Sequence, residues 1–171
     1  AVLRPFRSIL PTVDPTAFVD ASAQVIGDVH LGAESSVWMN VVVRGDVNSI
    51  RVGNRTNIQD LTLVHVMRET NPTVIGDNVT IGHSAVIHGC TIGNNVLIGM
   101  GAKIVGAITI GDNCQIGANA VVNKDVPANC TIVGVPGRII VRDGFRIEGD
   151  VAVMDNIINR VDPQDEVIRE M

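Results

Sequence analysis

Aliphatic residues recur every six positions along most of this chain, separated by short polar or glycine-containing steps. A period of six matches neither the 3.6-residue repeat of a helix nor the two-residue alternation of a simple strand. It is typical of a short strand, a turn and a second short strand, three of which close a triangular coil. The seventeen aliphatic positions are Val19, Val25, Leu31, Val37, Val43, Val52, Ile58, Val64, Ile75, Ile81, Ile87, Ile92, Ile98, Ile104, Ile110, Ile116 and Val122.

These repeats predict an all-β fold, a single-stranded parallel β-helix (hexapeptide-repeat solenoid) of about six coils. Successive coils would pair as parallel strands about 4.8 Å apart, with one aliphatic side chain per repeat pointing inward. The composition agrees with so thin a core, because the chain has no Tyr, one Trp and three Phe. Seventeen Gly and frequent Asn supply corner residues, where a positive φ is often required.

The repeat predicts two regions, a β-helix domain over residues 1–141 and a tail over residues 142–171. The tail is more charged and has no period, and Asp162-Pro163 followed by QDEVIREM predicts a short helix with Pro in its first turn. We expect this tail to cap the open end of the solenoid, where exposed strand edges would otherwise aggregate, or to dock on a neighbouring subunit.

The period breaks in three places. RGDVNSIR, between Val43 and Val52, has three extra residues. HVMRETNP, between Val64 and Ile75, has five extra residues, and one residue is missing at His88-Gly89-Cys90. Irregularities in a regular solenoid are where binding loops are expected.

Three histidines lie beside these breaks. Counting three sides per coil stacks Val64 and Ile87, so the residues after them, His65 and His88, form a vertical pair about one strand spacing apart. His83 lies on another side, roughly 16–20 Å away at the strand rise. We predict that His83 reaches the metal of a neighbouring chain, giving three interfacial sites around the axis of a homotrimer.

Three imidazoles with one open position are typical of a catalytic zinc, which lowers the pKa of its water to about 7 and creates a metal-bound hydroxide. Three imidazoles also suit Fe²⁺ or Co²⁺. Cys90 follows His88 by two residues, but its alternation points it inward, so we do not count it as a ligand. We interpret His30, which nothing matches in phase, as a hydrogen-bonded spectator.

Polar residues near the histidines are candidates for supporting roles. On the side that carries His83, we expect Gln59 to hydrogen-bond the metal-bound water. Asp60 or Asn57 would orient a ligand imidazole or the neighbour's Arg44. Arg44 and Asp46 flank a glycine, and we interpret them mainly as an ion pair at the subunit contact.

Charge and composition narrow the partners. The formal charge is −5, the pI is about 5.2 and no basic block is present, so nucleic acid is not expected as a partner. No apolar run approaches the roughly 18 residues that span a bilayer, and the first residues lack the long apolar region of a signal peptide. Three sparse Cys predict reduced thiols and a cytoplasmic location.

Four blocks together resemble the gamma-class carbonic anhydrases: RGDV (44–47), NIQD (57–60), LVHV (63–66) and GHSAVIHGC (82–90). The resemblance covers about residues 10–110, and only it implies a left-handed coil. It implies a homotrimer that converts CO₂ and bicarbonate at metal sites between subunits. It further implies His65, His83 and His88 as ligands, with Gln59, Asn57 and Asp60 near the metal and Arg44 and Asp46 at the interface.

The chain also departs from the prototype of that family. Val47 and the short loop MRETNP, with Glu69, stand where the prototype carries an acidic loop and proton-moving glutamates. The sequence therefore resembles the subclass without that loop, several members of which have weak or undetected hydratase activity. The segment KDVPANCTIVGVPGRII is similar to the end of serine acetyltransferases and related hexapeptide acyltransferases.

Three functional hypotheses follow. The first is zinc-dependent, reversible hydration of carbon dioxide to bicarbonate at a trimer interface. The second is a coenzyme A-dependent acyltransferase or thioesterase of the hexapeptide-repeat family. The third is a trimer that is clamped by metal and has no catalytic activity.

Overall fold

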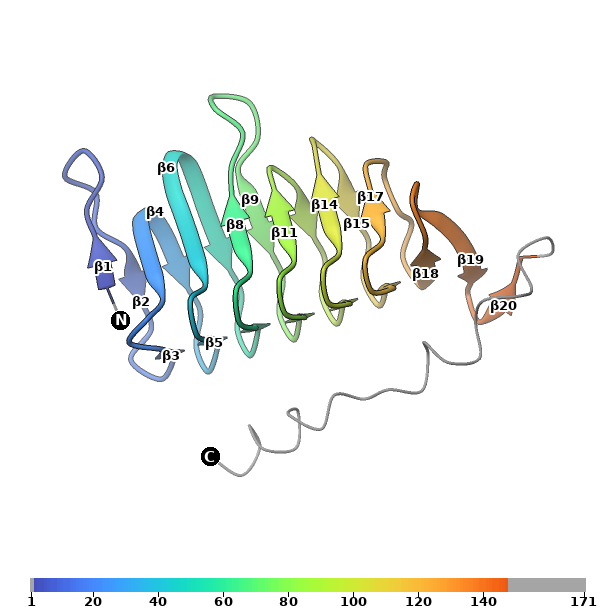
Figure 1. The fold of residues 1–171 in the computed structure, drawn as a ribbon, viewed down its shortest axis with the longest axis horizontal. Coiled ribbons are helices and arrows are strands. Elements are labelled where there is room, and N and C mark those ends of the chain that lie inside the picture. Colours follow the sequence, from blue (N-terminus) through green and yellow to red (C-terminus); the bar gives the residue numbers. More distant parts are fainter. Residues whose placement is uncertain (1, 148–171) are drawn as a thin grey trace.

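The structure is a computed structural model that describes residues 2–147, and all regular structure in that range is β-strand. The strands wind into an elongated solenoid with its coils stacked along one axis (Figure 1). The arrangement fits a left-handed parallel β-helix of about seven turns. The fold class is therefore confirmed.

The strands form two sheets that make the three sides of the prism. The eleven-stranded sheet contains β1 (Val2–Arg4), β2 (Thr12–Val13), β4 (Gln24–Leu31), β6 (Val42–Val52), β8 (Leu63–His65), β9 (Thr73–Ile75), β11 (Val86–His88), β12 (Thr91–Ile92), β14 (Lys103–Val105), β15 (Thr109–Ile110) and β17 (Val121–Val122). The nine-stranded sheet contains β3 (Phe18–Val19), β5 (Ser36–Val37), β7 (Asn57–Ile58), β10 (Thr80–Ile81), β13 (Leu97–Ile98), β16 (Gln115–Ile116), β18 (Cys130–Val133), β19 (Arg138–Arg142) and β20 (Phe145–Arg146).

The turn count exceeds the expected six because aliphatic residues at both ends extend the column beyond the seventeen predicted positions. At the first end, Leu3 pairs with Val25 and Val13 pairs with Leu31. At the other end, Ile132 stacks on Ile116. Leu3 lies ten residues before Val13, and Ile132 lies ten residues after Val122, so the sixfold spacing does not predict them, whereas Val13 is six residues before Val19 and continues the period.

The core is the aliphatic column that the period predicts. All seventeen inward positions are buried except Val19, which is partly buried and packs against the core. Strand pairing brings like residues together, as where Ile81 lies between Ile58 and Ile98 in the register. Burying a Val, Leu or Ile side chain contributes roughly 1.5–3 kcal/mol, so this column is the main source of stability.

The three breaks in the period have different outcomes. The RGDVNSIR segment is not a loop, because β6 continues through it and pairs with β8 on one side of the prism and β9 on the next. The strand below, β4, pairs along β6 with one register shift. Across that shift β6 advances from Gly45 to Ile50 while β4 advances only from Gly27 to Val29, so the three extra residues lie in β6 alone. Residues 66–72 do form a loop between β8 and β9, which projects beyond the neighbouring coils (Figure 1).

The one-residue deletion is accommodated at Gly89, which has a φ of +63°. A Cβ atom there would lie 2.3 Å from Cγ of Met67, so the position needs glycine for its backbone and for its close contact. At the other end of the chain, β19 and β20 form an antiparallel pair that extends beyond residue 141. The helix predicted from Asp162-Pro163 lies outside the described residues, and so does most of the proposed tail.

An amide ladder lines one corner of the prism. Arg55 Nε donates to Asn78 Oδ1 at 2.8 Å, and side-chain amides then donate from coil to coil until Asp143 accepts the last bond. Every member has φ between 50° and 59°, a conformation that Asn tolerates better than most residues. The members are Arg55, Asn78, Asn95, Asn113, Asn129 and Asp143.

We expect Asn95→Ala to lower the free energy of unfolding by about 1–2 kcal/mol, because alanine is strained at positive φ and cannot bridge the ladder. Denaturant unfolding followed by circular dichroism measures the change. Asn123→Ala is the matched control, because Asn123 is exposed and has no left-handed backbone. Equal stability of the two variants would contradict a stabilising role for the ladder.

Candidate metal centre

The first half of the candidate site is a column of outward side chains on the eleven-stranded sheet. The register pairs His88 with His65 below and with Val105 above. The two imidazole rings have centroids 5.2 Å apart and planes inclined by 60°. The vertical pair expected from the side count is therefore present in the structure.

Asp46 connects this pair to the bend of β6. Its carboxylate lies 2.9 Å from Nε2 of His65 and also pairs with the Arg44 guanidinium. Burial alone would raise the pKa of Asp46, but the hydrogen bonds with His65 and Arg44 outweigh it and hold that pKa below its usual value. The Arg44–Asp46 pair thus forms within one chain, and its place at a subunit contact stays a prediction.

Burial lowers the pKa of His88, and the nearby charges of His65 and Arg44 lower it further. The imidazole therefore keeps a lone pair for coordination to a lower pH than an exposed histidine would. Cys90 shows the opposite behaviour, because burial raises the pKa of its thiol to about 12. Cys90 is 2% exposed, as its predicted inward direction requires, and such a thiol is a poor metal donor.

The second half of the site lies on the nine-stranded sheet. His83 follows β10 by two residues and stands one coil above Asp60. Its Nδ1 atom is 3.0 Å from Oδ2 of Asp60. This carboxylate favours the tautomer with the proton on Nδ1 and the lone pair on Nε2, which is how carboxylates orient metal-binding imidazoles. Asp60 therefore contacts the imidazole of a candidate ligand, and its role in orienting a metal ligand stays a prediction.

Two buried amides lie next to Asp60 on and after β7. Asn57 and Gln59 are 7% and 2% exposed, two residues apart and on the same outward face of the strand. Asn57 Oδ1 and both polar side-chain atoms of Gln59 have no hydrogen-bond partner within the described part of the chain. Each orphaned group costs roughly 1–3 kcal/mol unless a water, a ligand or a second chain satisfies it.

A single chain does not bring the two halves together. His65 and His88 belong to one sheet and His83 follows a strand of the other. Among residues 2–147, no group of three or more His, Cys, Asp or Glu gathers closely enough to hold a metal. The donor chemistry nevertheless fits a zinc-type ion, with two stacked imidazoles, a third imidazole held by a carboxylate, and orphaned amides beside it.

The other sequence candidates lie away from this arrangement. His30 is exposed and pairs in register with Thr12 and Arg51, so it has no histidine neighbour in its column. Glu69 is exposed in the loop between β8 and β9, where it forms an ion pair of 3.4 Å with Arg68. No contact of Glu69 with the histidines is found among the described residues.

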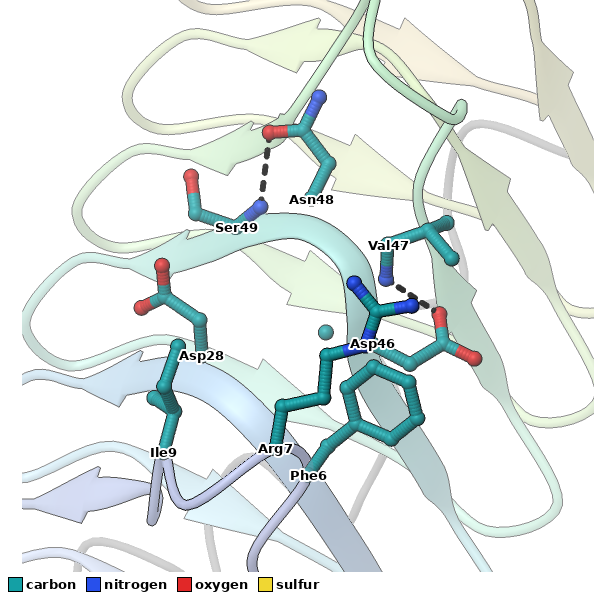
Figure 2. Close-up of a pocket in the computed structure, with 9 residues that line it drawn as sticks. Phe6, Arg7, Ile9, Asp28, Asp46, Val47, Asn48 and Ser49 are labelled. Carbon is teal, nitrogen blue, oxygen red and sulfur yellow. Dashed lines mark hydrogen bonds between the residues drawn. The ribbon is translucent and has the colours of Figure 1, made fainter.

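A pocket of about 310 Å³ lies between the N-terminal turn and the bend of β6 (Figure 2). Phe6 and Arg7 form one wall, and Asp46 through Ser49 form the other. In Figure 2 the Asp46 carboxylate accepts a hydrogen bond from the Val47 backbone amide, at 2.8 Å. None of the three candidate ligands lines this pocket, although Asp46, which does line it, contacts His65.

Sequence reasoning missed Ser36, which contacts the Asn57 amide, and Trp38, which contacts Ser36. Trp38 Nε1 and Asn57 Nδ2 both donate to Ser36 Oγ, at 3.1 Å and 2.7 Å. Ser36 and Asn57 are 21 residues apart, so their contact follows from the coil spacing. The available signal was the position of the single tryptophan, because Trp38 holds the same place in its repeat as Gln59, one coil earlier.

No helix in the described part of the chain is long and apolar enough to cross a membrane. Two family profiles match the sequence. The one described as "Bacterial transferase hexapeptide (six repeats)" matches residues 72–106 and 89–124, and "Hexapeptide repeat of succinyl-transferase" matches residues 107–153.

Two curated relatives and one solved structure are among the most similar proteins. Gamma carbonic anhydrase 1, mitochondrial, of Arabidopsis thaliana is 55% identical over 105 residues, which are 58% of this chain and 38% of the relative. Carbonic anhydrase of Geobacillus kaustophilus is 38% identical over 104 residues, 61% of this chain and 57% of the relative. The matched part of this chain thus covers 57% of the length of the Geobacillus relative and 38% of the length of the Arabidopsis relative.

The solved structure is that of a hexapeptide transferase family protein from Anaplasma phagocytophilum. It is 40% identical and superimposes with a TM-score of 0.79 over 82% of this chain and 84% of that one. The likeness therefore extends over nearly the whole described solenoid.

Proposed function

This chain belongs to the gamma carbonic anhydrase-like hexapeptide-repeat family, and from that premise we propose that it catalyses the reversible hydration of carbon dioxide to bicarbonate. The sites would be shared between neighbouring copies in a homotrimer. The observation that carries the proposal is the division of the histidines, a stacked pair on one sheet and a carboxylate-held third on the other.

The coil geometry supports a shared site. A threefold axis parallel to the solenoid axis rotates each copy without changing its height, so residues of the same coil meet at the same level. His83 and His88 belong to the same coil, because both stack one coil above Asp60 and His65. His83 of one copy would then arrive level with His88 of the next, one strand spacing from His65.

Exposed apolar side chains flank both halves, as expected for surfaces that associate. Met39, Leu61 and Met100, which are 44%, 61% and 56% exposed, lie at the corner that carries His83. Val105 lies beside His88 and is 41% exposed. Contact between these surfaces would bury the apolar groups and exclude water around the histidines.

The residues present have distinct roles in the proposed reaction. His65, His88 and the neighbour's His83 would hold a divalent metal, which when bound supplies an acidified water with a pKa of about 7 as nucleophile. Asp60 keeps the His83 lone pair on Nε2. Gln59 and Asn57 offer buried amide groups to orient the water and the bicarbonate oxygens. Val105 contributes an apolar wall suited to carbon dioxide.

The test is stopped-flow hydration of carbon dioxide by the purified protein loaded with Zn²⁺, Fe²⁺ or Co²⁺. We expect about one metal per chain and hydration activity that chelation removes and metal restores. His30→Ala is the control, since this exposed imidazole lies outside the site. Complete inactivity with all three metals would contradict the proposal.

Two other results would support the remaining hypotheses instead. Acetyl-coenzyme A turnover that survives His65→Ala would identify an acyltransferase, for which the transferase names of the matching family profiles are the supporting observation. Loss of the trimer on chelation, without any activity, would identify a metal clamp. A cytoplasmic location is part of the proposal and is supported by three buried free thiols.

A further inference from the structure

Three side chains on the outward face of the nine-stranded sheet form a hydrogen-bonded chain that ends at Asn57. Trp38 Nε1 donates to Ser36 Oγ at 3.1 Å, and Asn57 Nδ2 donates to the same oxygen at 2.7 Å. Ser36 and Asn57 are both at least nine-tenths buried. Water therefore has little access to compete for these bonds.

The contact with Ser36 decides how the Asn57 amide is turned. An amide side chain has a donating NH₂ end and an accepting carbonyl end. Because the NH₂ end is held by Ser36, the carbonyl oxygen is directed elsewhere, and Oδ1 is buried with no partner among the described residues. An acceptor held in this way is suited to an O–H donor, such as a water or the hydroxyl of bicarbonate.

Trp38 is itself fixed on the same face. Its ring lies on Phe18, with centroids 5.0 Å apart and planes inclined by 47°. Strand β5 pairs with β7 so that Val37 lies beside Ile58. Trp38 therefore lies one coil below Gln59. The indole thus hydrogen-bonds Ser36, the residue that holds the Asn57 amide, and lies one coil below Gln59 in the register.

We propose that Ser36 and Trp38 are positioning residues that hold Asn57 with its carbonyl oxygen toward the substrate, where it accepts a hydrogen bond from the water or from bicarbonate. The proposal rests on the carbon dioxide hydration proposed above. It assigns no contact with the metal to either residue, and it makes the single tryptophan a reporter of the site.

Ser36→Ala is expected to lower kcat/KM for carbon dioxide hydration about tenfold with unchanged metal content. The reason is that the side-chain amide of Asn57 is then free to rotate away from the orientation that Ser36 holds. Ser36→Thr keeps the hydroxyl and is expected to restore most of the rate. In an Asn57→Ala background, Ser36→Ala is expected to have no further effect. An undiminished rate in Ser36→Ala, or an equal loss in both backgrounds, would overturn the proposal.

Ser35→Ala is the matched control. Ser35 is the adjacent buried serine, but its hydroxyl bonds only to backbone atoms, donating to Gly53 O at 2.6 Å and accepting from Thr56 N at 3.0 Å. Its loss is expected to lower the melting temperature and leave kcat/KM of the remaining folded protein unchanged. A purely structural role for Ser36 would give the same pattern in Ser36→Ala.

A second readout does not depend on catalysis. The indole N–H of the only tryptophan gives one ¹H–¹⁵N signal, which should move upfield and exchange faster with solvent in Ser36→Ala but not in Ser35→Ala. An unchanged signal would overturn the positioning network even in an active enzyme. If the wild-type protein hydrates no carbon dioxide while the signal shifts as expected, the proposed function fails and the hydrogen-bonded network stands.

Discussion

Trimers that contain both His83→Ala and His88→Ala chains are expected to recover about one third of the wild-type carbon dioxide hydration activity, although each variant alone is inactive. Removing any one imidazole leaves two ligands, too few for a catalytic zinc site. In the proposed ring, each site takes two histidines from one chain and one from the next. Every mixed trimer therefore has one junction at which an intact pair meets an intact His83.

The experiment uses co-expression of the two variants with different affinity tags, so that purification on both tags selects mixed trimers. Metal analysis should find one tightly bound ion per mixed trimer and none in either parent. Mixed trimers of His83→Ala and His30→Ala chains provide a comparison, since His30 lies outside the site. If the mixed trimers are as inactive and metal-free as their parents, the two half-sites do not meet across chains.

The fold was predictable because inward side chains are set by one simple repeat. A six-residue period leaves no alternative secondary structure, and one aliphatic per repeat fills a prism too narrow for rings. The prediction was wrong where the chain leaves the period. The end coils around Leu3 and Ile132 were missed, and Val13 was left out although it continues the period before Val19. The three-residue excess at RGDVNSIR became part of β6, while β4 beside it keeps the six-residue step.

The stacking of site residues from one coil to the next was predictable from the sequence, whereas the individual side-chain hydrogen bonds of the site were not. The stack of His88 on His65 follows from counting sides, as does the place of His83 above Asp60. The bond from Asp46 to His65 and the contacts of Trp38 and Asn57 with Ser36 depend on side-chain rotamers, which the repeat does not determine. Buried amides without partners become visible only when every donor and acceptor has been placed.

The second large effect concerns Asp60. Asp60→Ala is expected to weaken metal binding by about 10–100-fold, because His83 loses the carboxylate that orients its ring and fixes its tautomer. Nδ1 of His83 lies 3.0 Å from Asp60 Oδ2, and both side chains are about one third exposed or less, so water replaces this contact only in part. Competition with a chromophoric chelator measures the affinity, and hydration at limiting zinc should fall in parallel.

Two variants separate orientation from charge. Asp60→Asn keeps an oxygen acceptor for Nδ1–H and is expected to lose much less affinity than Asp60→Ala, whereas a role based on charge alone would make the two losses equal. Asp28→Ala removes a carboxylate that pairs with Arg51 at 2.8 Å, outside the centre, and should leave metal affinity unchanged. If Asp60→Ala binds zinc as tightly as the wild-type protein, His83 is not a ligand whose lone pair Asp60 directs, and the interfacial centre loses its third imidazole.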